Sequence, residues 1–141
     1  MCYIDNMKTD AYKAEIATLA EKYGLDFVVL FGSQATGKTH AKSDIDLAVI
    51  TRGSINVPQL AVEFEHIFKR DDVEVVNLAI ASPTLMYAVS RDGQLLYEKE
   101  LGAYLRWRVY ATKIWMDTEW LRRMRDRKLI DWSLKHNEAH V

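Results

Sequence analysis

The sequence predicts an α+β protein in which a small sheet is flanked by helices and followed by a helical extension. Two apolar runs of strand length, residues 26–31 and 44–50, lie close together, and residues 72–78 begin with strand-like alternation. Segments of helical periodicity precede and separate these runs. The expected division is a body over residues 1–100 and an extension over residues 101–141.

The first element is predicted to be a helix that begins at Thr9 or Asp10, because these side chains suit an N-cap. Gly24 stands where glycine commonly ends a helix. The predicted apolar face of this helix carries Tyr12, Ile16, Leu19, Ala20 and Tyr23. The first strand follows directly.

A loop containing Gly32 and Gly37 connects the two apolar runs, and Gly32 lets the backbone come close to a ligand. The second run opens with Asp44 and Asp46. If both lie in a strand, they point to one face and stand about 6–7 Å apart at the backbone. The opposite face would then turn toward the core with Ile45, Leu47 and Val49.

Two neighbouring carboxylates on a buried strand repel each other unless a cation lies between them. Mg²⁺ is the expected cation, because it binds one or two carboxylates together with substrate phosphates. For an isolated pair of aspartates, a solvated strand end would be the simpler interpretation. The upstream Gly32-Ser33 turn favours the metal, since a hydroxyl and adjacent backbone N–H groups form an anion site. Together these features indicate nucleoside triphosphate chemistry.

The pattern of Gly32-Ser33, ten residues, then Asp44-x-Asp46 resembles the signature of the DNA polymerase β-like nucleotidyltransferase superfamily. The fuller string GSQATG…SDIDLAV is similar to its minimal nucleotidyltransferase branch, the antitoxins encoded beside HEPN-domain toxins. The resemblance implies a polymerase β-like core with a small mixed sheet, ATP as donor and two Mg²⁺ ions. It implies nucleotide-binding roles for Gly32, Ser33, Lys42 and Ser43, and catalytic and metal-binding roles for Asp44, Asp46 and Glu74.

The third acid is expected on the strand that begins at Asp72, where Asp72 and Glu74 share one face. If this strand lies beside the aspartate strand, Glu74 completes a carboxylate triad across a gap of about 4.8 Å. The resemblance favours Glu74 over Asp72, although aspartate is the commoner residue at that point. A plain strand-edge charge is the alternative for Glu74.

Three cations, Lys38, Lys42 and Arg52, lie around the predicted site in the sequence. Each could contact phosphate, but loop lysines are more often simply solvated. Many relatives carry an arginine before the second loop glycine, where this chain has Thr36. This departure leaves open how the loop neutralises the phosphates.

Two more helices are predicted in the body. Pro58 suits the first turn of one, whose core stripe is Leu60, Phe64, Ile67 and Phe68. The other opens at Ser82-Pro83, an N-cap followed by a proline at the first helical position. A short strand over residues 94–97 follows it.

From Leu101 the pattern becomes helical and is expected to remain so to about Lys128. The predicted stripe carries Leu101, Tyr104, Leu105, Val109 and Thr112, continued by Trp115, Met116, Glu119 and Trp120. The three tryptophans at 107, 115 and 120 cannot share one narrow face, so part of this surface is expected to stay uncovered for a partner. The alternative is that the rings pack on the chain's own sheet. The basic run over residues 122–128 is expected to be a solvated helix end, with an acidic partner or RNA as alternatives.

The charge is unevenly distributed over the 141 residues. The extension holds nine Lys/Arg against five Asp/Glu, and the body holds ten against fifteen. An acidic body needs a metal before it binds a triphosphate. Cys2 is the only cysteine, which excludes an intrachain disulfide and fits a reducing cytoplasm. The polar N-terminus and the short apolar runs predict neither export nor a membrane span.

The resemblance implies a cytoplasmic, Mg-dependent protein adenylyltransferase that transfers AMP from ATP to a tyrosine of a HEPN ribonuclease toxin and so silences it. One alternative is a nucleotidyltransferase for an aminoglycoside-like hydroxyl, and another is a non-catalytic antitoxin that acts by occlusion. Direct nucleic-acid binding is not expected, because the chain has no room for the further domain that polymerases and tRNA-end-adding relatives use.

Overall fold

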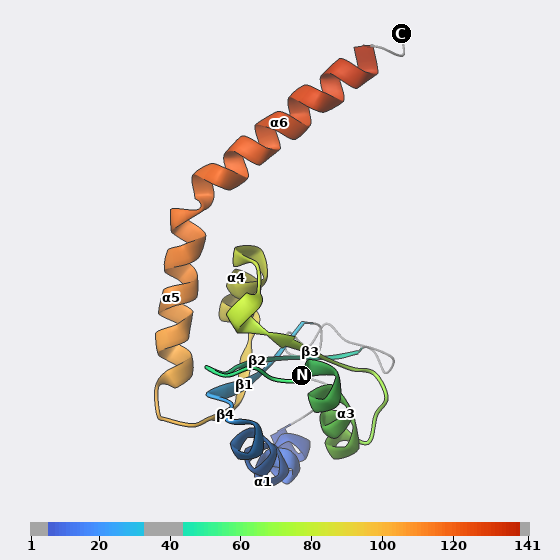
Figure 1. Cartoon of the computed structure of the whole chain (residues 1–141), viewed down its shortest axis with the longest axis vertical. Helices are drawn as coiled ribbons and strands as arrows, with labels where there is room; N and C mark the ends of the chain where they lie inside the picture. The colour runs from blue at the N-terminus through green and yellow to red at the C-terminus, as the bar shows by residue number, and fades with distance from the viewer. Residues whose placement is uncertain (1–5, 33–43, 139–141) are drawn as a thin grey trace.

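The computed structural model describes residues 6–32 and 44–138 (Figure 1). It contains a four-stranded sheet in the order β3-β2-β1-β4. β1 (Phe27–Phe31) is antiparallel to both β2 (Ile45–Ile50) and β4 (Gln94–Glu98), whereas β2 and β3 (Val73–Asn77) are parallel. The predicted α+β class with a small mixed sheet is confirmed.

Helices cover both faces of this sheet (Figure 1). One face is covered by α1 (Asn6–Tyr23) and α3 (Val57–Phe68), the other by α4 (Pro83–Asp92) and α5 (Ala103–Asp117). The 3-10 helix η1 (Leu78–Ile80) joins β3 to α4, and α6 (Glu119–Glu138) extends away from the body. None of the helices in the described part of the chain combines the length and apolar character that a membrane span requires.

Alternation along the strands divides the buried side chains between two cores. In the core beneath α1 and α3, the side chains from β2 are the predicted ones, Ile45, Leu47 and Val49. The core beneath α4 and α5 receives Ala48 from β2 and Val76 from β3. Asp46 and Glu74 lie two residues before these, so both acids belong to the sheet face that α4 and α5 cover.

The helix ends are capped by side chains and glycine. Ser82 Oγ accepts a hydrogen bond from Leu85 N–H at the start of α4, as predicted, and Asn56 Oδ1, which was not predicted as a cap, accepts one from Gln59 N–H at the start of α3. Gly24 ends α1 in the left-handed conformation, at φ +65°. The predicted start of α1 at residues 9–10 is wrong, because the helix continues back to Asn6 through two good helix formers.

The extension is two helices rather than the single one predicted. Thr118 separates α5 from α6, and its Oγ1 donates to the carbonyl of Ile114, four residues earlier in α5, at 2.7 Å. Such hydrogen bonds from threonine to the preceding turn often bend helices.

The predicted core stripe of the extension is partly wrong. Leu101, Leu105 and Val109 are 95%, 61% and 65% exposed. The buried face of α5 consists instead of Tyr104, Trp107 and Ala111. The centres of the Tyr104 and Trp107 rings lie 5.2 and 5.5 Å from the centre of the Phe27 ring on β1. Burying these large rings against the sheet stabilises the fold more than burying the aliphatic stripe would.

Candidate active site

Two of the predicted acids face each other across neighbouring strands. The parallel register of β2 and β3 pairs Asp46 with Glu74. Asp44 lies just before β2. The side chains of Asp44 and Glu74 are exposed, and that of Asp46 is half-buried. Parallel neighbours lie about 4.8 Å apart at the backbone, so the two strand carboxylates share one small area of the sheet. Asp44, Asp46 and Glu74 are called the acid set below.

The acid set is electrostatically coupled. The pKa of the Asp46 carboxyl is raised above its ordinary value of 3.8, first by burial and then by the negative charges of Glu74 and Asp44. All three causes act in the same direction, so within residues 6–32 and 44–138 no cation offsets the repulsion at Asp46. A cation or a proton would stabilise this arrangement.

Gly32 supports the position of Asp46 through its missing side chain. The β1–β2 register pairs Phe31 with Asp46, which brings the next residue, Gly32, beside the carboxylate. Gly32 has φ +75°, and a Cβ built there would overlap Asp46 Oδ2. Both the left-handed backbone and the close approach therefore require glycine.

Asp72, the competing candidate for the third acid, has a different role. Arg70 Nε donates to Asp72 Oδ1 at 2.7 Å, Arg70 Nη2 pairs with Oδ2, and this contact lowers the pKa of the Asp72 carboxyl. The Asp72 carbonyl also accepts a hydrogen bond from Ile45 N–H at 3.0 Å, which holds the starts of β2 and β3 together. Arg70 therefore engages the carboxylate of Asp72, whereas the strand register pairs Glu74 with Asp46.

The remaining predicted contacts lie elsewhere. Ser33, Lys42 and Ser43, together with Thr36, Gly37 and Lys38, lie outside the described residues. Arg52 follows the far end of β2, and the four steps along the strand from Asp46 to Ile50 alone span about 13 Å. The suggestion that Arg52 contacts phosphate beside the acid set is therefore wrong.

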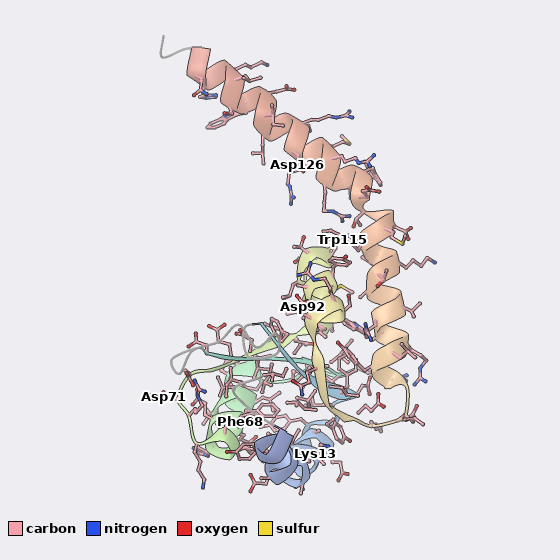
Figure 2. All side chains as sticks on the ribbon, turned by 180° about the vertical axis from the view of Figure 1, so that it is seen from behind. Lys13, Phe68, Asp71, Asp92, Trp115 and Asp126 are labelled. Carbon is pink, nitrogen blue, oxygen red and sulfur yellow. The ribbon has the colours of Figure 1, made fainter. Side chains whose placement is uncertain are left out.

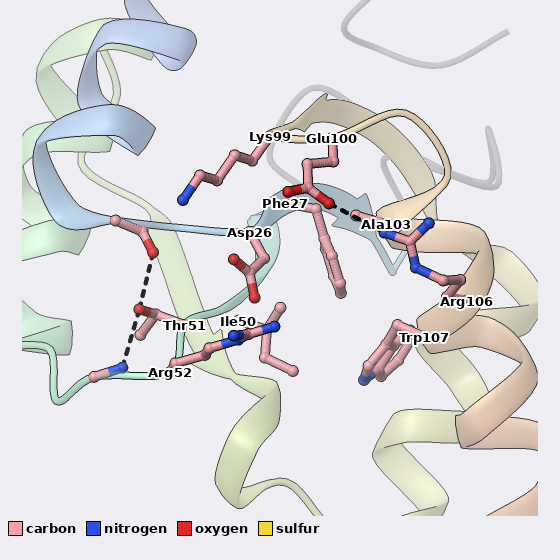
Figure 3. Close-up of a pocket in the computed structure, with 12 residues that line it drawn as sticks. Asp26, Phe27, Ile50, Thr51, Arg52, Lys99, Glu100, Ala103, Arg106 and Trp107 are labelled. Atoms are coloured by element: carbon pink, nitrogen blue, oxygen red, sulfur yellow. Dashed lines mark hydrogen bonds and ion pairs between the residues drawn. The ribbon is translucent and has the colours of Figure 1, made fainter.

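Arg52 instead lines a cavity of about 480 Å³ between the sheet and the start of α5. Figure 3 shows it with Lys99, Arg106 and Trp107 around the same space. Sequence reasoning missed this cavity, because its residues come from three separate segments that only the sheet brings together. No pattern in the chain marks it.

The acid set fits a hard divalent cation only in part. Among the described residues, no three His, Cys, Asp or Glu side chains form a ready-made metal site. Asp46, Glu74 and Asp44 nevertheless supply carboxylate oxygens, which are the donors that Mg²⁺ prefers. Because Mg²⁺ commonly completes its coordination with water and substrate phosphates, the set fits a metal that arrives with a nucleotide.

The family model for polymerase beta nucleotidyltransferases matches residues 14–101. The chain belongs to this family. The protein adenylyltransferase MntA of Aphanizomenon flos-aquae is 34% identical to this nucleotidyltransferase over 90 residues, which cover 53% of the chain and 58% of that relative. The match thus spans less than two thirds of the relative's length.

Two solved structures share the fold of this nucleotidyltransferase. A toxin–antitoxin crystallised with AMP-PNP superposes with a TM-score of 0.71 at 24% identity, covering 84% of this chain and 98% of that one. The MNT antitoxin structure in complex with the tri-AMPylated Shewanella oneidensis HEPN toxin gives 0.67 at 21% identity, covering 86% and 98%. The fold is thus shared over nearly the whole length of those chains.

Proposed function

We propose that this nucleotidyltransferase is an antitoxin that transfers AMP from ATP to a tyrosine hydroxyl of a HEPN toxin and thereby neutralises it. The observation that carries the proposal is the pairing of Asp46 with Glu74 on parallel strands, beside the glycine turn at Gly32. A pure binding protein has no need of coupled carboxylates at a half-buried position. The MntA relative and the complexes with HEPN toxin support protein adenylylation in particular.

In this proposal Asp44, Asp46 and Glu74 would hold Mg²⁺, expected as two ions. Bound there, Mg²⁺ would supply neutralisation of the charge on the triphosphate. Gly32, with Ser33, Lys42 and Ser43 as implied by the resemblance, binds the phosphates. Glu74 also receives the proton of the tyrosine hydroxyl.

The transfer step makes one bond and breaks one. The tyrosine oxygen bonds to the α-phosphorus of ATP, and the bond between that phosphorus and the bridging oxygen of the β-phosphate breaks. Pyrophosphate leaves with the bonding electrons. Most of the acceleration would come from orienting the acceptor and neutralising charge, as in phosphoryl transfer generally.

We further propose a division of labour along the chain. Residues 1–100 form the transferase body, which holds the acid set and the nucleotide. Residues 101–141 form the extension, which packs on the body through α5 and offers α6 to a partner. This division explains how a chain of this size could act on a whole protein.

The test combines purified protein, Mg²⁺, ATP and the HEPN protein encoded beside its gene, with intact-mass readout. We expect the partner to gain about 329 Da for each AMP, the group left when ATP loses pyrophosphate. Asp46→Asn and Glu74→Gln should abolish the gain. Asp71→Asn is the matched control, because Asp71 is an exposed acid outside the acid set.

Two outcomes would contradict adenylylation. One is a partner that is blocked by wild type without gaining mass, which would instead support neutralisation by occlusion. The other is a mass gain that persists in Asp46→Asn.

A further inference from the structure

The outward side of α5 carries an apolar groove that the sheet does not use. Leu105, Val109 and Met116 lie on one face of α5 and are 61%, 65% and 68% exposed. With Tyr87 of α4 they line a hollow of about 660 Å³. We call this hollow the α4–α5 groove.

The groove exists because α5 has two apolar faces. Tyr104, Trp107 and Ala111 are buried against the sheet, and the aliphatic stripe with Met116 points away from it. Three large apolar side chains along one exposed face of a helix are more than scattered surface residues. Burying each of them would stabilise a complex, since burial of apolar surface is favourable.

Cations line the same groove. Arg91, Arg108 and Lys113 border it, with Asp117 as the acid of its lining, and Arg91 is paired with Asp92 at 2.8 Å, which leaves Arg108 and Lys113 to give the groove its basic character. Arg108 is held in place, because its Nε donates to the Ser90 carbonyl at 2.9 Å and its guanidinium lies 5.7 Å from the ring of Tyr104. An apolar floor with basic edges is complementary to an apolar stripe with acidic edges.

The groove continues across the bend into α6. The ring of Trp115 stacks on Tyr87, 4.4 Å between centroids, and the guanidinium carbon of Arg122 lies 3.3 Å from the centre of the same indole ring. Arg122 also donates to Thr118 Oγ1 and to the Trp115 carbonyl, at 2.7 Å each. Figure 2 shows Trp115 where α5 lies beside α4, and Asp126 on the part of α6 beyond it.

The stack of Tyr87, Trp115 and Arg122 joins α4, α5 and the first turn of α6. A second hollow of about 660 Å³ follows at the bend, where Arg123 and Arg125 join the lining together with their ion-pair partners Glu119 and Asp126. Tyr87 and Met116 line both hollows, so the partly apolar surface continues from α4 to the first turns of α6.

The groove also lies on the functional side of the sheet. Side-chain alternation places Asp46 and Glu74 on the face that α4 and α5 cover. A protein held by α4 and α5 is thus on the same side of the sheet as the acid set.

We propose that the α4–α5 groove and the first turns of α6 bind an amphipathic helix with acidic flanks, presented by the protein that accepts AMP. A helix suits the site because α5, with 15 residues, offers a straight track of about 22 Å, and helices dock into such grooves through one apolar face. Nucleic acid would match the cations but leave the aliphatic floor uncovered. The identity of the partner rests on the proposed function, whereas the chemistry of the groove does not.

The test measures binding of the HEPN protein to the full chain by calorimetry, without nucleotide. Val109→Asp places a charge in the groove and should weaken binding at least tenfold. Val62→Asp is the matched control, since Val62 is 47% exposed on α3, at the opposite face of the sheet, and should change affinity less than twofold. Matching thermal melts of the two variants exclude misfolding. Lys113→Glu should weaken binding most at low salt.

The outcomes separate the groove from the chemistry. If Val109→Asp and Val62→Asp bind the HEPN protein with equal affinity, the α4–α5 groove is not the binding site, even if the wild type transfers AMP. Loss of binding in Val109→Asp alone supports the groove, even if no AMP is transferred. A wild type that does not bind the HEPN protein overturns both. Binding of single-stranded RNA that Val109→Asp abolishes would overturn the protein-helix assignment.

Discussion

Asp46 is the residue at which stability and the proposed chemistry oppose each other. Its pKa is raised by burial and by two neighbouring acids, so the folded protein binds a proton there more tightly than the unfolded chain does. The stabilising effect of that proton is fully present below the ordinary value of 3.8 and is lost as the pH rises through the folded value. At neutral pH the ionised carboxylate therefore destabilises the ligand-free protein.

Asp46→Asn should consequently raise the melting temperature at pH 7 in the absence of divalent cations. Because Asp46 is only half-buried and solvent screens it, we expect at most about 1 kcal/mol, or roughly 3 °C. The gain should disappear below pH 3.8, where the aspartate is protonated in both states. Thermal melts from pH 3 to 8 measure it. A gain that does not change with pH would contradict the electrostatic cause.

Three glycines allow backbone strain and steric overlap to be separated. Gly53→Ala should be nearly neutral, because its added Cβ meets nothing within 4 Å. Gly24→Ala adds strain alone, since φ is +65° with open space around it, and should cost about 1–2 kcal/mol. Gly32→Ala adds the overlap with Asp46 to the same strain and should cost more. Urea unfolding ranks the three variants by their loss of unfolding free energy. Equal losses for Gly24→Ala and Gly32→Ala would show that the Asp46 side chain moves aside at little cost.

The residues of the acid set could be predicted from the sequence more fully than their surroundings. The spacing of Asp44 and Asp46 after Gly32 pointed to one site, and the structure brings Asp46, Gly32 and Glu74 together. The choice between Glu74 and Asp72 could not be made from alternation, because both share one face. It depends on the contact with Arg70, which follows a left-handed residue at the end of α3.

At the scale of elements, α5 shows why periodicity alone misplaced part of the core. A helix with two apolar faces gives two valid stripes, and the sequence does not say which one meets the sheet. The aromatic face packs because Tyr104 and Trp107 reach Phe27. The sheet itself was predictable, since each strand has a clear apolar run. The sequence left open whether β3 lies beside β2, and it did not predict their parallel register.

The start of α5 is fixed by an acid from the preceding strand. Gly102, at the N-cap, has no capping side chain, and Glu98 accepts hydrogen bonds from Gly102 N–H and Tyr104 N–H, at 3.2 Å each. Glu98→Ala should therefore cost about 1 kcal/mol in urea unfolding, as loss of a helix cap does. Glu100→Ala is the control, because its ion pair with Arg106 is long, at 3.6 Å, and exposed. Equal effects would contradict capping by Glu98.

At the scale of the whole molecule, the body is closed on both sides of the sheet, whereas α6 stands apart from it (Figure 1). None of the described α6 side chains belongs to either core. Large apolar residues on α6 remain about half exposed or more, among them Trp120, Ile130 and Trp132. A helix of this kind contributes little to folding, so its exposed apolar surface is better explained by contact with another molecule.

A chain that ends after Thr118 tests this separation of roles. Because α6 contacts the rest of the chain mainly through Arg122 on Trp115 of α5, the shortened protein should unfold cooperatively with a melting temperature within about 4 °C of the full chain. Its helical circular dichroism should fall, and its affinity for the partner should fall with it. Trp107→Ala in the full chain gives the contrast, since removing a buried ring costs about 3–5 kcal/mol and lowers the melting temperature much further. A truncation as damaging as Trp107→Ala would mean that α6 is part of the folding unit, and its exposed residues would then need a structural explanation.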